Sequence, residues 1–344
     1  MRRDRGDARA RPAGGANPAV GVAVGVAVGV AVGLAVAAAW LVGAGARRLR
    51  REVRAHAAAA RRLGETRTPV SLPPGRGVVA VHARVAAPAA SASAAARVAA
   101  ALPAIVLVHG NGVSGAYHVP LAARIAESAA VYVPDLPGHG ATAGAGAPLD
   151  VVELAGSLAG WMDAHGVRGV LLVGHSMGCQ IVAECAARRP DLAAGVVLVG
   201  PTLDPTGRSA VALVARAALS APFERVALDL LAVRDYLRAG PRLVVTEMRH
   251  MLAHRIEGAL AELARRRLPV RVLRGAHDRI APQRWAEQVA RVAGAPPPLV
   301  LRRGGHAVQY GDPGAVAEQL LAFARLLAPA PRGDVAPAGR PAAR

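Results

Sequence analysis

The sequence contains no lysine, only two cysteines and few aromatic residues, and the last two shortages bear on the class of protein. With two cysteines in 344 residues, we expect neither a disulfide nor a second nucleophile. Cys179 and Cys185 lie six residues apart, and we expect both to be small buried side chains of one helix. Aromatic residues make up only 3% of the chain, whereas 53% of it is hydrophobic, which is enough for a sizeable core.

The positive charge is distributed unevenly along the chain. All 42 basic residues are arginine, and the formal net charge is +19. Residues 1–99 hold 16 of these arginines against 4 acidic residues, so most of the excess precedes the larger part of the chain. Nucleic-acid-binding surfaces combine basic side chains with aromatic ones on a single face. We therefore expect no nucleic-acid partner.

One long stretch carries no charge at all. Residues 19–46 are long enough to span a bilayer, Trp40 lies near their end, and a run of arginines follows directly. They predict a single transmembrane helix in the cell membrane, followed by a basic helix along its surface at residues 47–62. Seven arginines follow the span and five precede it, which favours a cytoplasmic location for the rest of the chain. A cleaved signal peptide and a Gly/Ala-rich leader are the alternatives.

The most informative motif is G-H-S-M-G at residues 174–178, with Ser176 at its centre. An apolar, β-branched run at residues 169–173 predicts a buried strand before it. Residues 179–189, without glycine or proline, predict a helix after it. Strand, G-x-S-x-G and helix together form the nucleophile elbow, a tight turn that presents the serine hydroxyl above a sheet.

A serine nucleophile requires a base and an acid that orients the base. Asp278 follows a predicted strand at residues 270–275, and His306 follows another at residues 299–301. The chain order Ser, Asp, His is that of α/β-hydrolases. Asp204, which follows the strand at residues 196–200, is the alternative acid, but the loop of Asp278 fits the role better.

Four blocks make residues 78–327 resemble the α/β-hydrolase superfamily. They are I-V-L-V-H-G-N-G at residues 105–112, V-Y-V-P-D-L-P-G-H-G at residues 131–140, the elbow, and the acid and histidine loops. The resemblance implies a mostly parallel sheet with helices on both faces and a helical lid. It also implies an oxyanion hole formed by the backbone N–H groups of Asn111 and Met177.

Several other histidines have simpler interpretations. His109, His139 and His175 lie in predicted turns, where a histidine usually bonds to a nearby carbonyl group. His250 and His254 have the i, i+4 spacing of metal ligands on a helix, but no third ligand or glutamate base accompanies them. We expect neither a metal nor a cofactor.

The chain divides into seven predicted segments. They are a basic tail (1–18), the transmembrane helix (19–46), a basic helix and linker (47–77), the hydrolase core (78–205 and 269–328), a helical lid (206–268) and a disordered tail (329–344). The apolar spacing of the lid suggests an acyl pocket. Four of its arginines could hold a substrate carboxylate, but we expect most of them to be solvated residues of a helix face: Arg238, Arg242, Arg249 and Arg255.

These features together predict a membrane-anchored serine hydrolase that cleaves a small or acyl-chain carboxylic ester through an acyl-enzyme on Ser176. Two alternatives stay open. The run G-H-A-V-Q-Y at residues 305–310 resembles carbon–carbon hydrolases of ring-fission products, although residues 113–118 lack the Pro-Gly and Trp-x-Asn pattern of those enzymes. The second alternative is a non-catalytic binding module with the hydrolase fold. An intact serine, aspartate and histidine argue against it, because a binding module has no need of all three.

Overall fold

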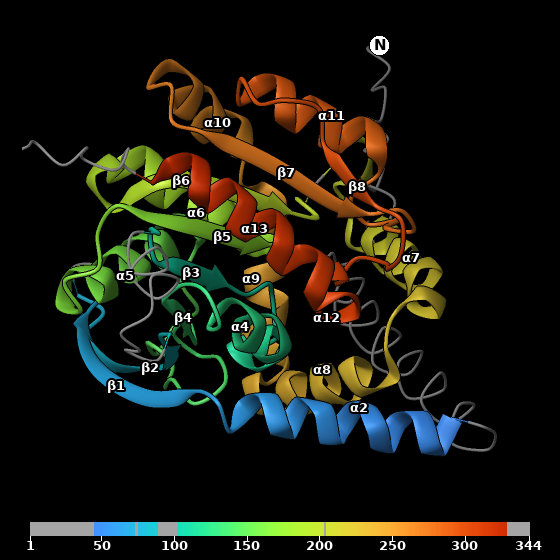
Figure 1. Ribbon diagram of the computed structural model, residues 1–344. Coiled ribbons are helices and arrows are strands. Elements are labelled where there is room, and N and C mark those ends of the chain that lie inside the picture. Colours follow the sequence, from blue (N-terminus) through green and yellow to red (C-terminus); the bar gives the residue numbers. More distant parts are fainter. Residues whose placement is uncertain (1–44, 73–74, 89–101, 203, 329–344) are drawn as a thin grey trace, which may run out of the picture.

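A computed structural model describes residues 45–72, 75–88, 102–202 and 204–328, and its centre is an eight-stranded sheet with helices on both faces (Figure 1). The strand order is β1-β2-β4-β3-β5-β6-β7-β8. β2 pairs antiparallel with both β1 and β4, and all other pairs are parallel. The strands are β1 (Gly64–Ser71), β2 (Val78–Ala86), β3 (Ile105–Val108), β4 (Val131–Pro134), β5 (Val170–His175), β6 (Ala193–Val199), β7 (Val270–Gly275) and β8 (Leu299–Leu301).

The central strands are buried on both faces. In β3, Ile105 and Leu107 belong to one apolar cluster, whereas Val106 and Val108 belong to the other. Side chains alternate between the two faces of a strand, so a continuous apolar run predicts this double burial. Cys179 and Cys185 are buried and unpaired, as the sequence predicts.

Each face of the sheet has its own helices. α4 (Val119–Ile125) and α13 (Pro313–Leu327) cover the face seen at the front of Figure 1. The other face packs against α5 (Val151–Ala164), α6 (Met177–Arg188), α10 (Ile256–Arg265) and α11 (Gln283–Val292). The short helix α12 (Val308–Gly311) follows the histidine loop. The fold is therefore the α/β-hydrolase architecture that the resemblance implies.

A strand occupies part of the segment predicted as a linker. β1 pairs with β2 over eight residues, from Gly64 opposite Val85 to Ser71 opposite Val78. The predicted linker that ends at residue 77 is wrong for residues 64–71, because pairing with β2, and not a local pattern, makes this segment a strand. β1 is the edge strand, and an edge strand tolerates proline where its missing N–H would face away from the sheet.

The basic segment forms helix α2 (Gly45–Ala60), which lies beside α8 along the lower edge of Figure 1. Its outer side carries exposed arginines. Among the residues that the structure describes, no helix is long and apolar enough to cross a membrane. The predicted transmembrane helix at residues 19–46 lies outside them except for its last two residues, and these belong to α2 instead.

Among the described residues, four α-helices and two short 3-10 helices lie between β6 and β7, mostly in the segment predicted as the lid. α7 (Ala210–Ser220), α8 (Val226–Ala239) and α9 (Pro241–Ala253) contribute side chains to one cavity beside the elbow. The fourth, α10, packs instead on α6 through Leu260 and Leu263, within the helical layer of the sheet. The part of the insertion that covers the cavity therefore ends with α9.

Candidate active site

Ser176 lies at a strained turn between β5 and α6. Its φ of 56° and ψ of −122° are unusual for a residue with a side chain, and such strain costs about 1–3 kcal/mol. The turn requires small neighbours: a Cβ atom on Gly174 would lie 2.3 Å from the Gly178 carbonyl oxygen, and one on Gly178 would lie 2.4 Å from that of Val108. This is the nucleophile elbow that the motif predicts.

Asp278 and His306 meet beside this turn. Asp278 Oδ2 lies 3.0 Å from His306 Nδ1, and Oδ1 accepts hydrogen bonds from the N–H groups of Ile280 and Ala281, both at 2.9 Å. Burial acts to lower the pKa of His306, but the carboxylate of Asp278 outweighs it, so this pKa lies above its usual value. His306 Nε2 makes no hydrogen bond to another described residue.

The alternative acid, Asp204, is occupied elsewhere. Its carboxylate accepts hydrogen bonds from Thr206, Arg216 and Arg284 at 2.7–3.0 Å. These cations and hydrogen bonds outweigh burial and lower the pKa of Asp204. The geometry therefore places Asp278, and not Asp204, beside His306.

The two predicted oxyanion donors lie close to Ser176, one in the turn after β3 and one directly after the serine in the chain. Met177 N is the first N–H of α6, and Asn111 lines the cavity together with Ser176. Gly110 approaches the serine so closely that a Cβ atom on it would lie 3.1 Å from Ser176 Cβ. The turn after β3 and the start of α6 thus stand on either side of the serine.

A hydrogen-bonded chain that the sequence does not reveal joins the β3 turn to the histidine loop. Gly110 N donates to the Tyr117 hydroxyl at 3.1 Å, and this hydroxyl lies 2.7 Å from His175 Nδ1. His175 Nε2 lies 3.0 Å from the carbonyl oxygen of His306. Burial lowers the pKa of His175 well below its usual value, so its ring is neutral and donates from Nε2. Tyr117 lies in the short 3-10 helix Gly115–His118, far from His175 in the sequence, so no local sequence pattern predicts the contact between them.

The other histidines that the sequence analysis considers each have a partner of their own. His109 Nδ1 donates to the carbonyl of Gly110 at 2.9 Å, and its Nε2 accepts from Leu136 N. His139 faces Glu247 at 3.1 Å. His250 bonds to the carbonyl of Leu149 and His254 to Glu184, so their spacing does not bring them together on one ligand. Among the described residues, no group of three or more metal-ligating side chains occurs.

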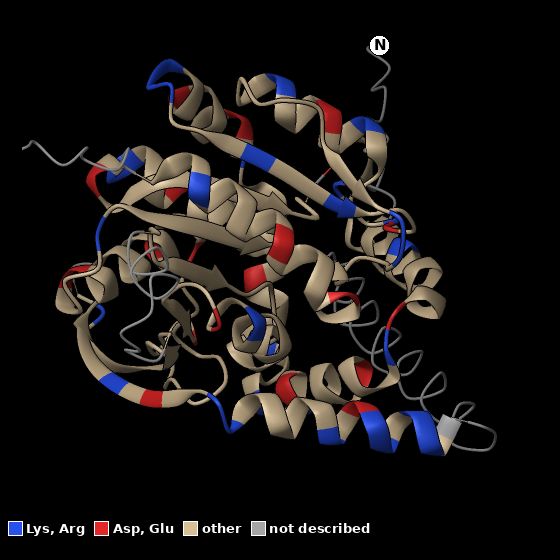
Figure 2. Ribbon diagram, in the orientation of Figure 1, with Lys and Arg blue, Asp and Glu red and all other residues tan. Residues whose placement is uncertain are grey.

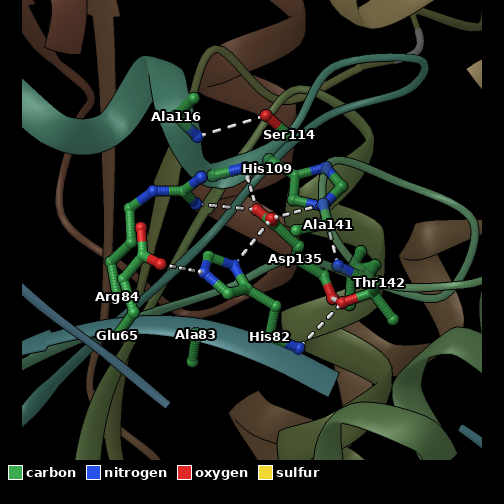
Figure 3. A network of polar contacts seen from close by, with 12 residues as sticks. Glu65, His82, Ala83, Arg84, His109, Ser114, Ala116, Asp135, Ala141 and Thr142 are labelled. Atoms are coloured by element: carbon green, nitrogen blue, oxygen red, sulfur yellow. Dashed lines mark hydrogen bonds and ion pairs between the residues drawn. The ribbon is translucent and has the colours of Figure 1, made fainter. Parts of the chain in front are cut away.

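Asp135, directly after β4, joins β2 to the turns that follow β3 and β4 (Figure 3). Its Oδ1 accepts from Arg84 and from the N–H of Gly115, at 2.9 and 2.8 Å. Its Oδ2 accepts from His82 and from the N–H of Ala141, both at 3.0 Å. Burial acts to raise the pKa of Asp135, but these partners outweigh it and hold the pKa far below its usual range. The carboxylate therefore stays ionised within the core.

Ser176 and His306 open into a mostly apolar cavity of about 300 Å³. Its walls come from the β3 turn, the elbow and α7–α9, with Leu213, Leu228 and Met248 among the apolar side chains. The four lid arginines considered for a substrate carboxylate are exposed, and none of them lines the cavity. Its only charged or ionisable members, within the described part of the chain, are Asp229, Glu224, Tyr117, Tyr236, His175 and His306.

A mostly parallel sheet with a strained serine elbow beside a His–Asp pair defines the class of α/β proteins with a nucleophile elbow. Within that class, a profile of the Alpha/beta hydrolase family matches residues 105–319. The chain belongs to the Alpha/beta hydrolase family.

Two curated relatives show how the similarity is distributed. The dihydrolipoyllysine-residue acetyltransferase component of the acetoin cleaving system of Cupriavidus necator is 36% identical over 77 residues, which is 22% of this chain and 21% of that protein. The chain thus spans only about a fifth of this relative. The pimeloyl-acyl-carrier-protein methyl ester esterase of Stenotrophomonas maltophilia is 24% identical over 259 residues, covering 67% of this chain and 96% of that protein.

Solved structures share the architecture. A membrane phospholipase A, described as a bacterial virulence factor, superposes with a TM-score of 0.62 and 21% identity over 86% of this chain and 96% of its own. A thermophilic esterase from Thermogutta terrifontis gives 0.61 and 19%, covering 77% and 100%. At these identities the likeness shows the fold alone.

Proposed function

We propose that this protein hydrolyses carboxylic esters through an acyl-enzyme on Ser176. The observation that carries the proposal is the Asp278–His306 pair, whose histidine lines the same cavity as the elbow serine. A buried carboxylate that holds Nδ1 leaves Nε2 as the proton acceptor, and Nε2 has no other described partner.

The reaction follows from these positions. His306 Nε2 takes the proton of the Ser176 hydroxyl as its oxygen attacks the ester carbonyl. The N–H groups of Asn111 and Met177 stabilise the oxyanion that forms. His306 then gives its proton to the departing alcohol. In the second half of the reaction, His306 takes a proton from the attacking water and returns it to Ser176 as the acid product leaves.

The relatives support this reaction class. One is named a methyl ester esterase and matches over nearly its whole length, and another, 37% identical over 118 residues, is named lipase LipV of Mycobacterium tuberculosis. An apolar cavity beside the serine suits the acyl chain of such a substrate.

Replacement of the serine tests the proposal. Ser176→Ala should lower the turnover of p-nitrophenyl esters at least about a thousandfold and abolish labelling by a fluorophosphonate probe. Ser128→Ala, in the turn after α4, is the matched control and should keep both. An alanine variant at position 176 that kept most of its esterase activity would disprove the proposal.

The length of the acyl chain tests the role of the cavity. Each methylene group buried against apolar walls contributes about 0.8 kcal/mol, which corresponds to roughly fourfold in kcat/KM. We expect kcat/KM to rise from p-nitrophenyl acetate to the hexanoate by about this factor per methylene. A flat or falling series would show that the acyl chain does not enter the cavity.

A further inference from the structure

Two carboxylic acids lie in the wall of the otherwise apolar substrate cavity. Glu224 precedes α8, and Asp229 lies in the first turn of that helix. Both line the cavity together with Ser176 and His306, and no arginine does so among the described residues. Apolar substrate pockets use a small number of placed polar groups to fix orientation and specificity.

The two acids are incompletely paired. Glu224 Oε1 accepts a hydrogen bond from the N–H of Ala307 at 3.1 Å, directly after the catalytic histidine. Its second oxygen, Oε2, is buried and has no hydrogen-bond partner among the described residues. Asp229 Oδ2 is buried and unpartnered in the same way. A buried carboxylate oxygen without a donor is costly, so a ligand that supplies donors there gains affinity.

A third acidic side chain, Glu52, lies outside the cavity and is paired with Arg48 and Arg225. Figure 2 shows acidic residues of α2 and α8 close together where these helices lie side by side. Glu52 of α2 accepts from Ala227 N and pairs with Arg225. The guanidinium of Arg225 also donates to the carbonyl of Gly311, so it is committed outside the cavity.

The titratable and charged groups near Asp229 are Glu52 of α2 with its partner Arg48, Glu224 and Arg225 from the segment before α8, and Tyr310 of α12. Burial, with Glu224 and Glu52, raises the pKa of Asp229 to about 7. The same side chain is therefore largely protonated at pH 6 and largely ionised at pH 8.

We propose that the cavity selects esters whose acyl chain ends in a protonated amine, and that Asp229 and Glu224 receive this ammonium group while the ester carbonyl lies at Ser176. An ammonium group has three N–H donors and a full positive charge, which match two incompletely paired carboxylates. The inference rests on the proposed ester hydrolysis and adds the chemical class of the acyl group.

Three p-nitrophenyl esters of equal chain length test the selection: the hexanoate, the 6-hydroxyhexanoate and the 6-aminohexanoate. At pH 8 the amine is protonated, because alkylammonium groups lose their proton near pH 10. We expect kcat/KM for the amino ester to exceed that for the hexanoate by at least about tenfold. An amino ester that is equal to or worse than the hexanoate or the hydroxy ester overturns the inference.

Variants assign the effect to the two acids. Asp229→Asn, which preserves the shape of the side chain, should lower the ratio of amino ester to hexanoate at least about tenfold, and Glu224→Gln should lower it as well. Glu318→Gln, an exposed acid on α13, removes the same charge outside the cavity and should keep the ratio of the wild type. A ratio unchanged in Asp229→Asn contradicts the assignment.

The wild-type protein offers a test that needs no variant in the cavity. The ratio of amino ester to hexanoate should fall severalfold from pH 8 to pH 6, because protonation removes the charge of Asp229. Titration of His306 affects both esters alike and cancels in the ratio. A ratio that does not change with pH counts against Asp229.

A binding measurement separates this inference from the proposed reaction. Calorimetry on the Ser176→Ala protein at pH 8 should show 6-aminohexanamide binding at least about tenfold more tightly than hexanamide. If the wild-type protein hydrolysed none of the three esters while Ser176→Ala showed this preference, the esterase would be rejected and the cation site kept. Hydrolysis of the hexanoate without any preference for the amine would keep the esterase and reject the site.

Discussion

The carboxylate of Asp278 reaches His306 from a different loop, so the base is oriented by tertiary structure and not by its neighbours in sequence. Its Oδ1 is held by two backbone N–H groups and its Oδ2 by the imidazole. This arrangement fixes the tautomer that leaves Nε2 without a proton. The orientation of a single ring thus depends on three hydrogen bonds to one buried side chain.

Replacement of each candidate acid by asparagine tests this orientation. Asp278→Asn should lower kcat/KM about a thousandfold or more, because the amide favours the wrong tautomer of His306. Asp204→Asn should cost little activity, because the Asp204 carboxylate binds Arg216 and Arg284 and does not contact His306. The opposite pair of results would move the acid to the loop after β6.

The pH profile of the same variant gives a second readout. A base is active when neutral, so kcat/KM falls as the pH decreases through the pKa of His306, which Asp278 raises above its usual value. Without that charge, the acidic limb of Asp278→Asn should move to lower pH. A limb that stays in place would show that His306 is not the titrating base.

At the scale of elements, Asp135 joins β2, β4 and the turn after β3 (Figure 3). A lowered pKa in the folded state contributes stability that is present above the unfolded pKa of about 4 and is lost as the pH falls below it. Asp135→Asn removes one partner of a buried ion pair and should lower the free energy of unfolding by about 3 kcal/mol at pH 7.

Urea unfolding at pH 7, 5, 4 and 3 measures this contribution. The difference between the wild type and Asp135→Asn should be constant from pH 7 to 5 and shrink below pH 4. Glu318→Gln is the exposed control and should unfold like the wild type at every pH. A difference below about 1 kcal/mol at pH 7 would contradict a stabilising role for Asp135.

The elements that the sequence predicts well are those with a local cause. The elbow follows from small residues around Ser176, and the central strands follow from apolar runs that are buried on both faces. β1 escaped prediction because its pattern includes Pro69 and its pairing depends on β2. The resemblance supplied the acid and the base, since no local pattern specifies which loops meet.

The wall of the cavity escaped prediction for a related reason. Helical periodicity assigns apolar residues of the lid to a buried side, but the cavity also receives Glu224 and Asp229. Their positions depend on how α8 docks against α2 and the histidine loop, through Glu52 and Ala307. The Tyr117–His175 contact likewise joins residues 58 positions apart. Contacts of this kind become visible only when the elements are packed.

For the whole molecule, the distribution of charge relates the described fold to the preceding chain. The central strands carry few charged residues, whereas exposed arginines line the outer side of α2 (Figure 2). Residues 19–44, which lead into this helix, are uncharged. α2 also contacts α8 through Glu52, so it belongs to the fold and is not a detached linker.

We propose that residues 19–44 anchor the protein in the cell membrane, with the hydrolase domain in the cytoplasm. The 344-residue chain should sediment with membranes and stay there in 1 M salt. Salt at that concentration reduces the Debye length to about 3 Å and screens the arginines, but it does not affect hydrocarbon insertion. Protein in the soluble fraction at low salt would refute the anchor, and release by salt alone would indicate adsorption through the arginines of α2.

Removal of the anchor should release an active enzyme if the cut respects the fold. The linker interpretation of residues 47–77 would allow a cut at residue 68, but such a cut removes α2 and more than half of β1, which pairs with β2 over eight residues. Deletion of residues 1–44 leaves both elements intact and should give a soluble protein with the kcat/KM of the complete chain. Deletion of residues 1–68 should lower the melting temperature, because Arg225 loses Glu52 and β2 loses part of its partner. Equal stability of the two truncated proteins would show that α2 and the first residues of β1 are dispensable. If the protein without residues 1–44 still sedimented with membranes, the anchor would lie within α2 itself.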